Sequence, residues 1–198
     1  MIDGLVDRTD KHQVISRLLK QIRATEVSLF ETHCTIAKKD ETLYQNLTSL
    51  PVHFVKTISA VDPAQMSFSL LGSLSRNRRC LFKLKNGINF NEFVSERQLL
   101  LRTEVVGGPE GNFYRQQRTL LMLHHYVAIY SSVVSSYILG IKPSEAREFA
   151  SLMFPELDEL NFISCIFSLP FTRSEELHNF MSDAAADAGG YAFDRISR

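Results

Sequence analysis

The basic run "SRNRRCLFKLK" (75–85) is the stretch of this sequence best suited to contact nucleic acid, and it contains no acidic residue. Guanidinium groups can bind phosphate or guanine through two parallel hydrogen bonds. The DNA-contact candidates in this run are Arg76, Arg78, Arg79, Lys83 and Lys85. A solvated loop, or a surface that docks on an acidic protein, would have the same composition, so these two readings stay open beside DNA contact.

A second stretch, "YILGIKPSEAREFASLMFP" (137–155), reads like the turn and second helix of a helix-turn-helix. A recognition helix usually presents Arg, Lys, Asn or Gln to base edges. This helix offers Arg147 alone, beside Glu145 and Glu148. We therefore interpret the stretch as a packing motif, with Arg147 as its single DNA-contact candidate.

The run "YRQQRTLLMLHHYVAIYSSVVSSYILG" (114–140) is apolar over more than one face. Such a helix is typical of the centre of a bundle or of a subunit interface. The acidic residues that follow it could meet a basic partner or a neighbouring copy, although a solvated face would look the same. The partner-interface candidates are Tyr126, Tyr130, Val133, Tyr137, Glu156, Asp158 and Glu159.

Residues with catalytic or metal-binding chemistry do not form a recognisable pattern. His124 and His125 are consecutive on the predicted helix and point about 100° apart, so we expect buried, hydrogen-bonded histidines there. His33-Cys34 has no second pair at zinc-ligand spacing. The "GGPEG" segment (107–111) lacks the Lys-Ser/Thr of a phosphate-binding loop. The sequence therefore predicts no enzyme, no metal site, no cofactor and no small-molecule substrate.

Charge is distributed unevenly along a chain whose formal net charge is zero. Residues 1–99 carry an excess of four basic groups, and residues 100–198 carry an excess of four acidic groups. A neutral protein binds DNA poorly without sequence specificity, because that affinity comes from neutralising phosphates. If DNA is the ligand, a local basic patch or a basic partner must supply the charge.

The 198 residues allow one large domain or two small ones, with 44% hydrophobic and 22% charged residues. No run approaches the eighteen apolar residues of a membrane span, so no membrane partner is expected. The three cysteines are far apart in the sequence, which favours reduced thiols in a cytoplasmic protein. The N-terminus does not resemble a secretory signal.

Helical periodicity and turn signals predict the elements that would position these residues. A helix is expected from His12 to about Ile36, and a second begins after a cap at Asp40. A third has Ser49 as its cap and Pro51 in its first turn. Residues 114–140 are expected to form one helix with Gly140 as its C-cap, followed by a helix that Pro143 and Glu145 begin. Short extended segments are expected at residues 66–74 and in "SCIFSLPF" (164–171).

Two stretches of the chain share an order of features. The helix through Phe30 would correspond to the helix through Tyr137, and "SLP" (49–51) would correspond to "MFP" (153–155). The "MSFSLL" and "SCIFSLPF" segments would then correspond as well. A duplication and a chance likeness of two helical bundles are both compatible with these few identities.

The second of these units resembles FlhD, the subunit that works with FlhC in the flagellar master regulator. The residues that carry the resemblance are Tyr137, Leu139, Gly140, Ile141, Ala146, Ala150, Leu152, Pro155 and, after a short gap, "SCIFSLPF". The first unit resembles the same pattern more faintly, through Leu47, Leu50-Pro51 and "MSFS". The resemblance implies a mainly helical, oligomeric transcriptional activator, with relatives that control DNA transfer on mobile elements. This chain has twice the usual length and lacks the clustered cysteines of FlhC-type subunits.

The fold class expected from all of this is all-α, with room for short β segments, as two similar FlhD-like helical units in a pseudo-dimer. The expected organisation is a first unit (1–85), a connector (86–112), a second unit (113–182) and a tail (183–198). The expected function is that of a transcriptional activator subunit that binds DNA as a homo-oligomer or with an FlhC-like partner, for flagellar or DNA-transfer genes. The alternative is a protein-protein adaptor or chaperone of a secretion or conjugation apparatus that does not bind DNA.

Overall fold

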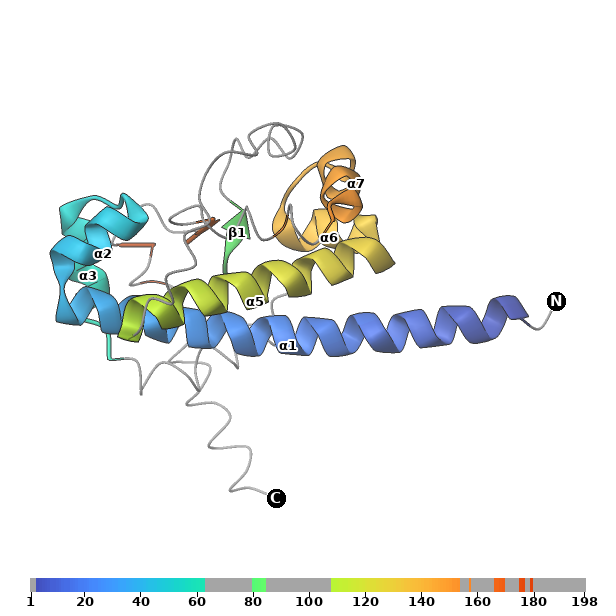
Figure 1. Ribbon diagram of the computed structural model, residues 1–198, viewed down its shortest axis with the longest axis horizontal. Helices are drawn as coiled ribbons and strands as arrows, with labels where there is room; N and C mark the ends of the chain where they lie inside the picture. The colour runs from blue at the N-terminus through green and yellow to red at the C-terminus, as the bar shows by residue number, and fades with distance from the viewer. Residues whose placement is uncertain are drawn as a thin grey trace, which may run out of the picture.

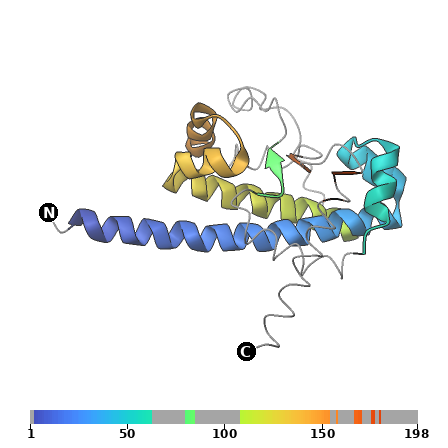
Figure 2. The same ribbon diagram turned by 180° about the vertical axis from the view of Figure 1, so that it is seen from behind.

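Helices make up most of the chain that the computed structural model describes, which comprises residues 3–62, 80–84, 108–153, 157, 166–169, 175, 176 and 179. The all-α prediction is therefore confirmed. Two long helices, α1 (Asp3–Lys39) and α5 (Gly108–Tyr130), lie side by side and antiparallel (Figure 1). The N-terminal part of α1 extends beyond the end of α5, as both views show (Figure 2).

The interface between α1 and α5 combines an apolar core with a small polar cluster. Phe30 and Leu29 of α1 and Leu120 and Leu121 of α5 are buried in one continuous core. Beside this core, the amide of Gln116 donates to Ser28 Oγ at 2.7 Å and its carbonyl oxygen accepts from Thr32 Oγ1 at 2.8 Å. These hydrogen bonds satisfy polar groups that would otherwise be costly beside a dry interface.

A pair of short helices packs at each end of the long pair. At the C-terminal end of α1 lie α2 (Glu41–Thr48) and α3 (Val52–Ser59), and at the C-terminal end of α5 lie α6 (Ser132–Leu139) and α7 (Pro143–Ser151) (Figure 1). None of the helices in the described part of the chain has the length and apolarity needed to cross a bilayer.

Two very short strands complete the described elements. Strand β1 (Lys83–Leu84) pairs antiparallel with β2 (Phe167–Ser168), so that Lys83 lies opposite Ser168 and Leu84 opposite Phe167. Strand β2 lies within the "SCIFSLPF" segment, where an extended conformation was predicted. The other predicted extended segment, residues 66–74, lies outside the described residues, as does the tail (183–198).

Several predicted caps and boundaries are confirmed, and others are wrong. Asp40 caps α2 by accepting the Leu43 N–H at 2.9 Å, as predicted. The predicted cap of α3 is wrong: Ser49 is the left-handed C-cap of α2, with φ of 57°, and Pro51 itself is the N-cap of α3. The first helix begins nine residues before His12, and α5 begins at Gly108, within the predicted connector (86–112).

The prediction of one helix over residues 114–140 is also wrong, because the chain breaks at Ser131. Ser131 has extended backbone angles, and its Oγ accepts the Val134 N–H at 3.3 Å, which makes it the N-cap of α6. A serine at this position competes for backbone hydrogen bonds and so starts a new helix. Gly140 does act as a C-cap, with φ of 68°, but it ends α6.

The two halves of the described chain follow the same pattern at a constant offset of 91 residues, the separation of the N-caps Asp40 and Ser131. The same offset relates the left-handed C-caps Ser49 and Gly140. It aligns α2 with α6 and α3 with α7, and buried positions match almost throughout. The predicted pairing of Phe30 with Tyr137 was therefore in the wrong register, since Tyr137 corresponds to Asn46.

Candidate functional site

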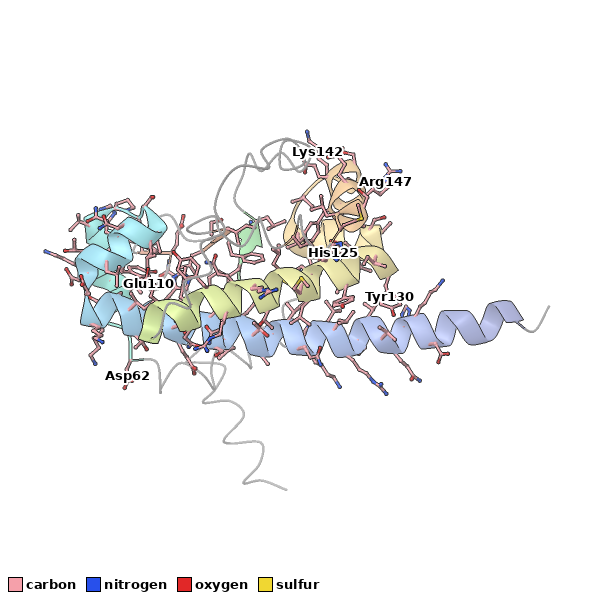
Figure 3. All side chains as sticks on the ribbon, viewed as in Figure 1. Asp62, Glu110, His125, Tyr130, Lys142 and Arg147 are labelled. Carbon is pink, nitrogen blue, oxygen red and sulfur yellow. The ribbon has the colours of Figure 1, made fainter. Side chains whose placement is uncertain are left out.

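The predicted DNA-contact residues are described only in part. Lys83 is exposed on β1, and Arg147 is exposed on α7, where its Nε donates to the Pro143 carbonyl oxygen at 3.3 Å. Arg147 and Lys142 both extend from the outer side of this end of the molecule (Figure 3). Arg76, Arg78, Arg79 and Lys85 lie outside the described residues.

The helix that contains Arg147 packs as a helix corner. The chain turns between α6 and α7 at residues 140–142, and Glu145 accepts the backbone N–H of Lys142 at 2.8 Å. Ala146 and Phe149 are fully buried against the core. One side of α7 is therefore committed to packing, while Arg147 lies on the solvent side.

The aromatic and aliphatic interface candidates are exposed. Tyr126, Tyr130, Val133 and Tyr137 all lie on the surface, and 73% of Val133 is accessible to solvent. Ile129, which the sequence interpretation omitted, belongs with them: Ile129 and Tyr130 follow Tyr126 by three and four residues, so both lie on the side of α5 that carries Tyr126. We call these five residues the α5–α6 apolar face; Tyr130 is labelled in Figure 3. The acidic candidates Glu156, Asp158 and Glu159 lie outside the described residues.

The corresponding face of the first half is equally exposed but polar. At the constant offset, the five positions of the α5–α6 apolar face correspond to Thr35, Lys38, Lys39, Thr42 and Asn46, and all of these are exposed. The fold therefore forms with polar residues at these positions. Packing within the chain does not account for the apolar residues in the second half.

A cluster of buried polar side chains lies between the two long helices, and the sequence analysis did not identify it. It contains Glu26 of α1, Cys80 just before β1 and His124 of α5, whose carboxylate oxygen, sulfur and ring nitrogen all lie within 4.8 Å of one another. Glu26 and His124 are fully buried, and Cys80 is partly buried. These three segments are far apart in the sequence, so no spacing rule could find the cluster.

Hydrogen bonds satisfy only part of this cluster. Glu26 Oε1 accepts the Phe82 N–H at 2.9 Å, which attaches the start of β1 to α1. Within the described part of the chain, Glu26 Oε2 and both ring nitrogens of His124 have no hydrogen-bond partner. His124 was expected to be buried and hydrogen-bonded; it is buried, but the second expectation is wrong. His125 meets both expectations, since it is buried and its Nε2 lies 3.1 Å from the Leu152 carbonyl oxygen.

Burial dominates the protonation equilibria of the cluster. It raises the pKa of Glu26 from 4.5 to about 8, although the Phe82 N–H and the positive charge of Arg23 act in the opposite direction. Burial lowers the pKa of His124 from 6.5 to about 3, so this imidazole is neutral. Burial, together with the charge of Glu26, raises the pKa of the Cys80 thiol. An unassisted thiolate is therefore disfavoured at this site.

This geometry does not match a cysteine nucleophile with its base. In such a site the imidazole hydrogen-bonds to the thiol through one nitrogen and to the carboxylate through the other. Neither nitrogen of His124 makes a hydrogen bond to any described residue. The same three atoms are, however, a sulfur, a nitrogen and an oxygen, which is a donor set that transition metal ions bind.

The equivalent positions in the other half are occupied differently. Gln117 corresponds to Glu26 and accepts the Ile166 N–H at 2.9 Å, as Glu26 accepts that of Phe82. His33 corresponds to His124, and its Nδ1 lies 2.7 Å from the hydroxyl oxygen of Tyr44.

Comparison of the chain with protein-family models, with curated proteins and with solved structures gives no match.

Proposed function

We propose that this chain is a subunit of an oligomeric transcriptional activator resembling FlhD, and that it works by binding, without catalytic turnover. The α5–α6 apolar face is the observation that carries the proposal. Its five side chains are large, apolar and exposed, whereas the equivalent positions of the first half are polar. Large exposed apolar side chains of this kind are used in protein-protein interfaces.

A second copy of this chain is the partner we assign to the face. Pairing two such faces would bury the tyrosines on both sides. Each square ångström of apolar surface removed from water would contribute roughly 25 cal/mol to the free energy of association. Tyrosine is enriched in interfaces of this kind. Because the first half has Lys38 and Lys39 where the second has Ile129 and Tyr130, the described part of the first half has no equivalent apolar face.

The described basic residues support a role in DNA binding. Arg147 on α7 corresponds to Lys56 on α3, so each half of the chain exposes a cationic side chain at the same position. Repeated basic positions in an oligomer suit DNA whose half-sites are themselves repeated. The basic run from Arg76 to Lys85 supplies the greater charge density in the sequence.

The test is retention of a labelled, promoter-sized duplex by the full chain at low and at moderate salt. We expect retention at low salt and a steep loss with added salt, because phosphate contacts release counterions. The Arg76→Ala/Arg78→Ala/Arg79→Ala variant should lose most of the retention. A second variant combines Val133→Thr and Tyr137→Asn, which places the residue types of the equivalent Thr42 and Asn46 on the α5–α6 apolar face. This variant should bind the duplex more weakly because it cannot assemble.

Val52 provides the matched control, since it is an exposed valine on α3, outside the α5–α6 apolar face. Val52→Thr should bind DNA as the parent does. A parent chain that ignores DNA at every salt concentration would overturn the DNA-binding role and favour the adaptor.

A further inference from the structure

The cluster of Glu26, Cys80 and His124 leaves buried polar atoms without a partner in the part of the chain that the structure describes. These atoms are Glu26 Oε2 and the two ring nitrogens of His124, and all three belong to fully buried side chains. A buried polar atom without a hydrogen bond costs free energy, so native proteins rarely leave several in one place. A ligand between these side chains would satisfy them.

The donor atoms define what this ligand is. Thiolate sulfur, imidazole nitrogen and carboxylate oxygen together are ligands of Zn²⁺, which binds them at about 2.3, 2.0 and 2.0 Å. Mg²⁺ and Ca²⁺ prefer oxygen alone. One thiolate and one carboxylate also neutralise a divalent ion, so the ion would not leave net charge in the buried region.

The separation of the donors is close to what coordination needs. The three atoms lie within 4.8 Å of one another, and tetrahedral zinc places its ligand atoms roughly 3.5 Å apart. Coordination would therefore require the donors to move closer by up to roughly 1.3 Å. Three protein ligands leave a fourth position for water or another donor.

The two halves differ at the positions that matter for a metal. His33 Nδ1 is hydrogen-bonded to Tyr44, while its Nε2 has no partner among the described residues; the residue equivalent to Tyr44 in the other half is Ser135, whose shorter side chain makes no hydrogen bond to any described residue. Within the described ranges, both nitrogens of His124 are therefore without a hydrogen-bond partner, whereas only one nitrogen of His33 is. At the position equivalent to Gln117, which has a neutral amide, the other half has Glu26. Glu26 supplies a carboxylate beside His124.

We propose that Glu26, Cys80 and His124 bind one divalent transition metal ion, with Zn²⁺ as the natural occupant. The ion would link α1, α5 and the segment that enters β1. Two of its ligands are fully buried, so binding of the ion should also stabilise the folded chain. On binding, the Cys80 thiol and any protonated Glu26 carboxyl release their protons to solvent, while His124 binds through a neutral nitrogen.

The experiment is titration of the metal-stripped, tag-free full chain with Zn²⁺, and with Co²⁺ as a spectroscopic probe. We expect one ion per chain, a sulfur-to-cobalt charge-transfer band, displacement of Co²⁺ by Zn²⁺ and a higher melting temperature. Cys80→Ser should remove the charge-transfer band. Cys34→Ser, which changes a buried cysteine outside the cluster, should leave the band and the stoichiometry unchanged.

Glu26→Gln is the second variant, and Gln117 shows that a glutamine is accommodated at the equivalent position and accepts the same kind of backbone hydrogen bond. It should keep the circular dichroism spectrum of the parent and weaken Co²⁺ binding by more than roughly 100-fold, the upper range for losing an outer-shell partner. A parent chain that binds neither ion would overturn the proposal, as would a charge-transfer band that survives Cys80→Ser.

Discussion

His33 shows how burial alone fixes the charge of a side chain in this core. It packs between the rings of Phe82 and Phe113, with ring centroids 5.3 and 5.0 Å away, and its Nδ1 lies 2.7 Å from Tyr44 Oη. Burial lowers the pKa of His33 from 6.5 to about 3. The imidazole is therefore neutral in the folded chain at every pH above that value, whereas the unfolded chain binds a proton below pH 6.5.

The depressed pKa of His33 predicts a loss of stability in acid. As pH falls from about 6.5 towards 3, the free energy of unfolding should decrease by about 1.4 kcal/mol per pH unit for this histidine, because only the unfolded state takes up the proton. We expect His33→Gln to show a shallower decrease than the parent in urea unfolding at pH 7, 6 and 5. Parallel pH profiles of the two chains would show that His33 does not contribute.

At the scale of elements, the helix ends follow local chemistry that the sequence displays. The cap at Asp40, the Gly140 C-cap, and Pro143 with Glu145 at the start of α7 were all predicted and are confirmed. The break at Ser131 was missed because the apolar run continues across it on both sides. Aligning Ser131 with the N-cap Asp40 would have revealed the break, but that alignment needs the 91-residue offset that the structure establishes.

The two equivalent C-caps provide a matched test of backbone strain. Ser49 and Gly140 both have positive φ, which costs a residue with a Cβ roughly 1 kcal/mol. Ser49→Gly should raise the free energy of unfolding by about 0.5–1 kcal/mol. Gly140→Ala should lower it by about 1 kcal/mol; a Cβ there would meet no atom within 4 Å, so the cost comes from the backbone.

Chemical denaturation of both variants at one pH measures this difference directly. Equal effects of the two substitutions, or a Ser49→Gly variant less stable than the parent, would contradict the assignment of strain to the left-handed caps.

At the scale of the whole molecule, the sequence predicted the helical class but not which residues meet. The predicted repeat paired the wrong residues because equivalent positions are alike in burial but often differ in residue type. Tyr44 and Ser135, both buried, illustrate this. The same limit concealed the cluster of Glu26, Cys80 and His124. The antiparallel packing of α1 and α5 brings Glu26 and His124 together (Figure 1), and the segment that enters β1 adds Cys80. The tyrosines of the α5–α6 apolar face could be singled out from the sequence because an apolar residue needs no distant partner to be noticed; the structure shows that they are exposed.

The difference between the two halves leads to our central proposal, that the chain assembles with a second copy through the α5–α6 apolar face. The described halves have an equal element order, and the interpretation as a pseudo-dimer that arose by an FlhD-like duplication stays a prediction. The polar residues at the equivalent face of the first half explain why assembly would use one face and end at a pair.

The most direct test is the mass in solution, measured by light scattering over a range of concentrations at moderate salt. We expect the parent and Val52→Thr to have twice the mass of one chain, and the variant with Val133→Thr and Tyr137→Asn to have the mass of a single chain. A parent that remains a single chain at every concentration, or a face variant that pairs as the parent does, would contradict the account.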